Sequence, residues 1–160
     1  MDSPSLKVIC NQASFKSLTV VKEVKKGEFL CDLWGVVSPV GMHTVQVDKE
    51  KHILPASNLS YTNHSCDPNA EFVFKPRNGI TVPKGKELSW YLVARREIKQ
   101  GEEVTFDYTL TEYDMNDPFE CKCGADDCLG TVRGFKYLNN KQQQERLAHI
   151  SPAIKKIVNN

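Results

Sequence analysis

The sequence predicts a mostly β fold with a short helical tail at its C-terminus. Short runs rich in β-branched and aromatic residues recur from residue 6 to residue 110, turn residues separate these runs, and strong helix formers gather only after residue 138. With 160 residues, the chain can bury one core and fits a single domain with a short appendage. We therefore expect a β-rich body, a cysteine-rich segment and a helical tail.

The expected strands follow one another through the first two thirds of the chain. Each is a β-branched or alternating run bounded by turn residues, such as the Lys25-Lys26-Gly27 turn. They cover Leu6–Cys10, Leu18–Val21, Phe29–Leu33, His43–Asp48, 70–76, 87–98 and Glu103–Leu110. In the tail, Asn139–Ile150 predicts a helix with Asn140 as its N-cap, and a second short helix is expected to start at Pro152.

Composition narrows the classes of function. The net charge is +1, so no overall field attracts nucleic acid or membrane, and we expect neither direct nucleic-acid binding nor membrane association. No stretch approaches the roughly 20 apolar residues that span a bilayer. The N-terminus carries Asp2 and no long apolar run, which predicts no signal peptide and an intracellular protein, nuclear or cytoplasmic.

Three of the six cysteines lie within eight residues, in the C-x-C-x4-C pattern of Cys121, Cys123 and Cys128. Three thiolates at this spacing can wrap one face of a metal, and structural zinc takes four such ligands. Three free thiols on a surface loop are the alternative, although crowded exposed thiols are reactive. We favour a zinc site. Its fourth donor could be a histidine, Cys10, Cys31, or Cys66, which the Asp67-Pro68 turn would orient.

Three motifs resemble, in order, the two signature motifs and the post-SET zinc segment of SET-domain protein lysine methyltransferases. They are "NHSCDPN" (Asn63–Asn69), "GEEVTFDY" (Gly101–Tyr108) and "CKCGADDCLG" (Cys121–Gly130), and "KKGEFLCDLWGVV" extends the likeness backwards. On this resemblance the chain divides into a SET domain (1–117), a post-SET zinc-binding segment (118–134) and a C-terminal helical tail (135–160) that matches no motif.

The resemblance implies the SET-domain β fold with its pseudoknot. In that fold a C-terminal segment passes through a loop formed by an earlier stretch, which brings "NHSC" against "FDY". The post-SET zinc site would then use the cysteine of "NHSC" together with the C-x-C-x4-C pattern. In this sequence those ligands are Cys66, Cys121, Cys123 and Cys128.

The resemblance also implies methyl transfer from S-adenosylmethionine to the ε-amine of a lysine in a histone tail or another protein. Asn63, His64 and Tyr108 would bind the cofactor, and Tyr108 would be the catalytic tyrosine. Phe106, two residues earlier, would line the lysine channel, and His43 would lie beside it. Because Phe106 has no hydroxyl to orient the amine, we expect dimethyl- or trimethyl-lysine as the product.

The sequence departs from the family pattern at several points. Most SET domains carry Gly-x-Gly near the start, whereas the corresponding stretch Asn11–Leu18 has no glycine. Ser60 stands where arginine is usual, and the segment between Gly35 and Asn58 is short. A catalytically silent SET module that binds a protein partner, with zinc purely structural, is therefore the alternative. A zinc-ribbon nucleic-acid binder would need clustered basic residues, which the net charge does not supply.

Overall fold

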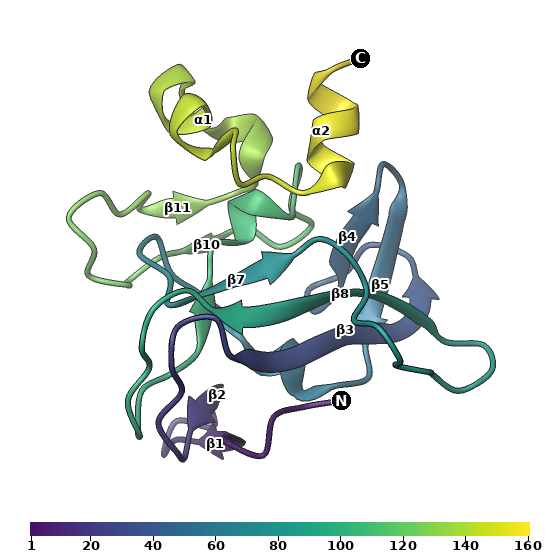
Figure 1. The fold of residues 1–160 in the computed structure, drawn as a ribbon. Coiled ribbons are helices and arrows are strands. Elements are labelled where there is room, and N and C mark those ends of the chain that lie inside the picture. The colour runs from purple at the N-terminus through teal and green to yellow at the C-terminus, as the bar shows by residue number, and fades with distance from the viewer.

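A five-stranded antiparallel sheet forms the centre of the protein in the computed structural model, which describes residues 1–160 (Figure 1). The strand order is β4-β5-β3-β8-β7, and every neighbouring pair runs antiparallel. The strands are β3 (Phe29–Ser38), β4 (Val45–Asp48), β5 (Lys51–Pro55), β7 (Ala70–Val73) and β8 (Glu87–Ala94).

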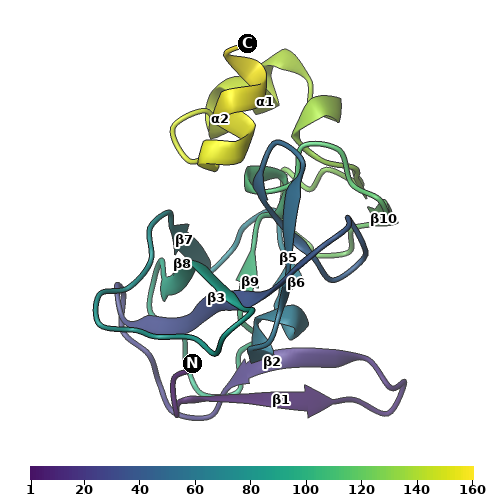
Figure 2. The ribbon, with the colours of Figure 1, turned by 90° about the vertical axis from the view of Figure 1, so that its right-hand side faces the viewer.

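Three short strand pairs surround this sheet. The hairpin of β1 (Leu6–Cys10) and β2 (Lys16–Val20) lies at the foot of the molecule, at the opposite end from the two helices (Figure 2). The other two pairs are the parallel pair β6 (Asn63–His64) with β9 (Thr105–Phe106) and the antiparallel pair β10 (Phe119–Glu120) with β11 (Thr131–Val132). The chain also contains three short 3-10 turns, η1 (Asn58–Tyr61), η2 (Tyr108–Leu110) and η3 (Phe135–Tyr137).

The main core consists of 16 buried residues, most of them from the sheet and the hairpin and the rest from η1, β9 and the connecting loops. Leu18, Leu33 and Leu92 come from β2, β3 and β8 and are 0% exposed. In β8 the buried positions alternate, as expected for a strand with one face on the core, whereas the central strand β3 is buried over most of its length. Phe106 belongs to the same core, so the strand β9 that carries it is anchored in the larger of the two cores.

Four expected strands are shorter than predicted, and four strands were missed. The strand predicted over Glu103–Leu110 ends at Phe106, because Asp107 caps η2 by accepting a hydrogen bond from the Thr109 N–H. The strand predicted from His43 begins at Val45, because residues 41–44 form a turn closed by the Thr44 hydroxyl. The structure adds β5, whose residues carry too little apolar alternation to stand out in the sequence. It also adds β6, β10 and β11, which are only two residues long each and so show no alternation.

The tail folds into α1 (Asn140–Arg146) and α2 (Pro152–Val158), which confirms the predicted helical tail. The N-cap of α1 is Asn139 and not Asn140, because Asn139 forms a reciprocal capping box with Gln142. A second, smaller core of Phe135, Ile150 and Ile154 lies beneath the helices. Neither helix has the length and apolar character needed to cross a membrane.

Candidate functional site

The pairing of β6 with β9 brings together two motifs that lie about forty residues apart in the sequence. Asn63 pairs with Thr105 and His64 with Phe106 in parallel register. The Ser65 N–H then donates to the Phe106 carbonyl at 3.1 Å. The expectation that "NHSC" lies against "FDY" is therefore confirmed.

Tyr108 is placed by two hydrogen bonds to the first of these motifs. Its hydroxyl donates to the Thr62 carbonyl at 2.7 Å, and its backbone N–H donates to His64 Nδ1 at 3.0 Å. Burial, together with the nearby charges of Glu112 and Glu103, raises the pKa of the Tyr108 phenol above its ordinary value. The hydroxyl therefore stays protonated, and its proton is directed at the Thr62 carbonyl.

The His64 side chain connects the tyrosine to the cysteine-rich segment. It is 0% exposed, and this burial lowers the pKa of the imidazole to about 4, so the ring is neutral at pH 7. Because Nδ1 accepts the Tyr108 N–H, the ring proton lies on Nε2, which is 3.3 Å from Cys66 Sγ. Neutral His64 thus donates toward Cys66 while it holds the backbone of Tyr108.

Four sulfur atoms form a compact cluster beside His64. The Sγ atoms of Cys66, Cys121, Cys123 and Cys128 all lie within 4.8 Å of one another. The Cys66 and Cys121 sulfurs are 3.9 Å apart, close to the separation of about 3.8 Å across a zinc tetrahedron with 2.3 Å bonds. Of the other donors considered, Cys10 is exposed on β1 and Cys31 is buried within β3. The donor set fits a tetrahedral thiophilic metal.

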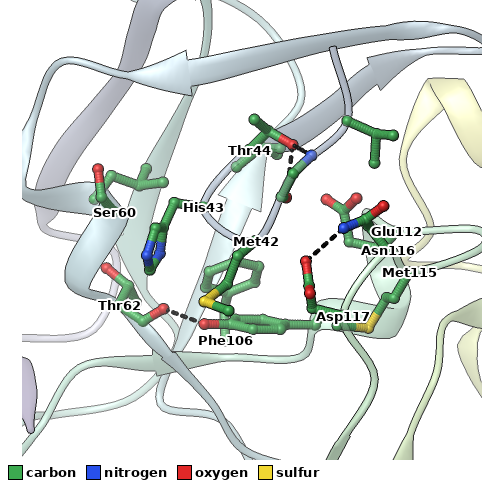
Figure 3. A pocket seen from close by; sticks show the side chains of 15 residues that line it. Met42, His43, Thr44, Ser60, Thr62, Phe106, Glu112, Met115, Asn116 and Asp117 are labelled. Carbon is green, nitrogen blue, oxygen red and sulfur yellow. Dashed lines mark hydrogen bonds between the residues drawn. The ribbon is translucent and has the colours of Figure 1, made fainter. Parts of the chain in front are cut away.

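A small pocket of about 60 Å³ opens beside the Tyr108 hydroxyl (Figure 3). Phe106, Tyr108 and His43 all line it, so the structure brings these three predicted site residues together. His43 comes from the turn before β4, and its ring points into the pocket on the same side as Ser60 and Thr62. No lysine or arginine lines the pocket, whereas Glu112 and Asp117 both do.

The other two predicted cofactor residues lie outside this pocket. The Asn63 side chain donates to the Lys16 carbonyl at 3.2 Å and to the Glu103 carboxylate. Neither Asn63 nor His64 lines the pocket beside Tyr108 or the larger cavity, of about 490 Å³, beside α1. Asn63 instead faces β2 and the loop that precedes it.

That loop is the stretch that lacks Gly-x-Gly. The Asn11 side-chain oxygen accepts hydrogen bonds from the N–H groups of Ala13 and Phe15, both at 2.9 Å. Ser14, between them, takes a left-handed conformation with φ of 61°. The side-chain bonds of Asn11 therefore support a tight turn without a glycine, and the Lys16 carbonyl links this turn to Asn63.

Sequence reasoning missed two residues next to the site. Arg146 of α1 donates from Nε to Asp107 Oδ2 at 2.9 Å, directly beside Tyr108. Glu112, four residues after Tyr108, is a nearly buried carboxylate on the pocket wall. Neither residue belongs to a motif, and each has its partner on a distant part of the chain, so no local signal could have identified it.

Comparison with known proteins agrees with the fold. The SET domain family model matches residues 16–109. The methyltransferase flvH of Aspergillus flavus is 37% identical over 91 residues, which are 57% of this chain and 45% of that protein. The histone-lysine N-methyltransferase mes-4 of Caenorhabditis elegans is 45% identical over 82 residues, or 47% of this chain and 8% of that protein. The chain therefore spans less than half the length of these relatives.

Solved structures show the same architecture. The crystal structure of KRYPTONITE in complex with mCHH DNA, H3(1-15) peptide and SAH superposes with a TM-score of 0.59 at 21% identity. The superposition covers 79% of this chain and 29% of that one. A second KRYPTONITE structure, in complex with mCHG DNA and SAH, gives a TM-score of 0.61 at 22% identity and covers 79% of this chain and 28% of that one. At this level of identity the likeness supports the fold.

Proposed function

This chain belongs to the SET-domain family, and on that basis we propose that it transfers methyl groups from S-adenosylmethionine to the ε-amine of a lysine in a protein. The observation that carries the proposal is the 2.7 Å hydrogen bond from the Tyr108 hydroxyl to the Thr62 carbonyl at one end of the pocket. Relatives named as histone-lysine N-methyltransferases support the choice of a lysine substrate, with a histone tail as one candidate.

The residues at this end of the pocket suit a reaction that needs a neutral amine. Lysine is mostly protonated at pH 7, with an ordinary pKa of about 10.4, and the positive charge of a bound sulfonium would disfavour the ammonium form. Because the Tyr108 proton is directed at Thr62, the lone pairs of the hydroxyl can accept an N–H of the amine. The raised pKa of Tyr108 keeps it a neutral phenol, which is a poor competitor for the methyl group.

The cofactor, when bound, supplies an electrophilic methyl group on its sulfonium. We assign its binding to Asn63, His64 and Tyr108, on the parallel strand pair and the turn that follows it. The Thr62 hydroxyl, next to Asn63, is buried without a hydrogen-bond partner, which leaves polar bonding capacity where a ligand would lie. The glycine-free turn before β2 would take the place of the family's glycine loop.

The cysteine cluster would hold one structural zinc ion. Four thiolates leave no open position on a tetrahedral metal, so the role is to shape the site and not to catalyse. The ion would tie residues 121–128 to Cys66 and thereby hold His64 Nε2 in the contact that directs its Nδ1 at Tyr108.

The wall of the pocket favours multiple methylation. Phe106 is 6% exposed and packs against the rings of Tyr108 and Phe72 at centroid distances of 4.8 and 5.1 Å. With no hydroxyl at this position, neither the amine nor a water is held, and a methylated nitrogen can turn for another transfer. We infer that the product is dimethyl- or trimethyl-lysine, unless His43 supplies a polar partner from the other wall.

The test combines cofactor binding with a substrate screen. Calorimetry with S-adenosylmethionine measures binding, and a lysine-containing peptide library with labelled cofactor measures transfer. We expect both signals from the wild-type chain. A folded chain that binds no cofactor would contradict the proposed methyltransferase activity. It would favour the alternative, a catalytically silent SET module that binds a protein partner.

A further inference from the structure

We propose that Arg146 is a positioning residue for methyl transfer and that it acts through Asp107 on the turn that carries Tyr108. The inference deepens the proposed function and rests on it, since it takes Tyr108 as the residue that contacts the methylated amine. Arg146 lies in α1, within the helical tail that matches no motif of the family. The tail would therefore determine turnover as well as stability.

The turn that carries Tyr108 is too short to be stable by itself. Tyr108 is the first residue of η2, a 3-10 turn of three residues. So short a turn makes few internal hydrogen bonds, and its geometry depends on the groups that bond it from outside. The N-cap is Asp107, whose Oδ1 accepts hydrogen bonds from the Thr109 N–H at 3.0 Å and the Thr109 hydroxyl at 2.7 Å. The orientation of the Asp107 carboxylate therefore determines the orientation of this turn.

Arg146 fixes the orientation of that carboxylate. Its Nε donates to the other oxygen, Asp107 Oδ2, at 2.9 Å, and no lysine or other arginine pairs with Asp107. Its Nη1 donates to the Gln142 carbonyl at 3.4 Å within the same helix, so the guanidinium is itself bonded at two points. Both side chains of the pair are nearly buried, so water has little access to replace the bond between them. The carboxylate therefore cannot turn away from Thr109 without breaking its bond to Arg146.

The tail also bonds the end of the same turn. The Leu110 carbonyl accepts the N–H of Ser151, the N-cap of α2, at 2.8 Å. Leu110 packs against the smaller core, which consists of Phe135, Ile150 and Ile154. Tyr108 itself bonds the first motif, through the Thr62 carbonyl and His64 Nδ1. The turn is thus bonded by the first motif at Tyr108 and by the tail at both of its ends.

A purely structural role for Arg146 makes a different prediction. Its removal would lower the fraction of folded protein but leave the turnover of each folded molecule unchanged. A positioning role lowers the turnover of folded molecules, because a small displacement of the Tyr108 hydroxyl misplaces it relative to the amine. The chain offers a matched control in Arg77, which donates to both oxygens of the fully buried Asp32 at 2.9 and 2.7 Å. That pair does not bond η2 and lines neither the pocket beside Tyr108 nor the larger cavity.

Arg146→Ala and Arg77→Ala separate the two roles. Each leaves a buried aspartate without its cation, so both should lose stability. With saturating S-adenosylmethionine and a peptide that the wild type methylates, kcat per folded molecule should fall by about 10- to 100-fold in Arg146→Ala only. Circular dichroism in the assay buffer measures the folded fraction. Equal kcat per folded molecule in the two variants would overturn the proposal.

Arg146→Lys keeps the test possible if Arg146→Ala does not fold. A lysine retains the positive charge beside Asp107 but not the planar guanidinium that bonds Asp107 and Gln142 together. This variant should fold and still lose about tenfold in kcat, as expected when a hydrogen bond to a charged group is disturbed. Wild-type kcat in Arg146→Lys would refute a role for the guanidinium.

Chemical rescue tests the hydrogen bond itself. Arg146 lines the larger cavity, of about 490 Å³, so a small ion can reach the space that its side chain leaves in Arg146→Ala. Methylguanidinium supplies the same N–H donors and, at concentrations that do not denature the protein, should restore most of the lost kcat. Tetramethylammonium carries the same charge without an N–H donor and should restore none. Rescue by neither ion, or by both equally, would contradict the proposal.

Hydrogen exchange gives a readout that does not depend on methyl transfer. The Tyr108 N–H donates to His64 Nδ1 at 3.0 Å, and NMR can follow its exchange with solvent. This N–H should exchange about tenfold faster in Arg146→Ala than in Arg77→Ala, and methylguanidinium should reverse the change.

The two readouts distinguish failure of this inference from failure of the proposed function. A wild-type protein that methylates its peptide, with unchanged kcat and Tyr108 exchange in Arg146→Ala, overturns the inference and leaves the proposed function standing. Faster Tyr108 exchange that methylguanidinium reverses, in a chain that methylates no peptide, would support the effect of Arg146 on the turn and defeat the methyltransferase.

Discussion

Arg146 and Asp107 form a buried ion pair that fastens α1 to the residue beside Tyr108. The Arg146 Nε donates to Asp107 Oδ2 at 2.9 Å, and the two side chains are 11% and 6% exposed. The other oxygen of Asp107 accepts from the Thr109 N–H and hydroxyl at 3.0 and 2.7 Å. The tail is thus part of the scaffold that holds the site, although it matches no motif of the family.

Removing Arg146 should destabilise the fold through the charge it leaves behind. We expect Arg146→Leu to lower the free energy of unfolding by about 3 kcal/mol, because Asp107 would remain buried and unpaired. Adding Asp107→Asn should recover part of this loss. Lys141→Ala, which affects only an exposed pair with Glu145, should change stability little. Urea unfolding measures all three, and a loss under about 0.5 kcal/mol for Arg146→Leu would show that the pair contributes nothing.

Tyr108→Phe should abolish most methyl transfer while cofactor binding persists. We expect turnover to fall by about 100-fold, because the hydroxyl acts at the reacting amine and not on remote parts of the cofactor. Tyr137→Phe removes another tyrosine hydroxyl, which bonds only the exposed Asp114, and is the matched control. Calorimetry and a radiometric assay separate the two effects. Equal losses of binding and turnover would indicate that Tyr108 serves in packing.

Metal analysis of the purified protein should find one zinc ion per chain. Cys66→Ser should release it, lower the melting temperature and weaken cofactor binding, because the segment held by the other three cysteines would lose its anchor beside His64. Cys10→Ser, at an exposed cysteine outside the cluster, should retain the metal. A zinc-free wild-type protein with normal stability would disprove the assignment.

Phe106→Tyr should shift the product toward monomethyl-lysine. A hydroxyl at this position would bond the amine or a water and restrict rotation of a methylated nitrogen. Mass spectrometry of a methylated peptide over time should show wild type passing beyond the first methyl group. Wild-type product that stops at monomethyl-lysine would refute the inference, and His43→Ala would then show whether His43 imposes the limit.

Stability should fall between pH 5 and pH 8 because of Glu112. Burial raises the pKa of its carboxyl from 4.5 to about 7, against the opposing hydrogen bonds from Gln46 and Thr111. The folded protein therefore holds this proton to a higher pH than the unfolded chain does. The resulting stabilisation is complete below pH 4.5 and is lost as the pH rises through 7.

The groups that face Glu112 do not reverse this sign. Burial lowers the pKa of His52 and so disfavours its charged form, and Tyr108 stays protonated. From this residue alone we expect a loss of about 2–3 kcal/mol between pH 5 and pH 8. Urea unfolding of wild type and Glu112→Gln at both values isolates the effect. A difference between the two proteins that does not change with pH would contradict it.

The family, the β-rich body and the four clustered cysteines could be predicted from local patterns in the chain. Alternation along Leu6–Cys10 or β8 indicates which side chains face a core. The C-x-C-x4-C spacing indicates that the three cysteines can bind the same metal ion. These signals are local. They can be recognised in a short stretch of sequence because the alternation of a strand and the spacing of metal ligands both involve residues that are close neighbours in the chain.

Contacts between residues far apart in the chain could not be predicted in this way. Arg146 and Asp107 are separated by 39 positions, and Glu112 and Gln46 by 66. Nothing in a window around either residue marks it as buried, since an arginine in a helix or a glutamate after a turn is usually exposed. Their burial follows from packing of the tail and of β4 against the turn after Phe106. The support of Tyr108 by Arg146 and Asp107, and the place of Glu112 on the pocket wall, therefore became visible only once the chain was folded.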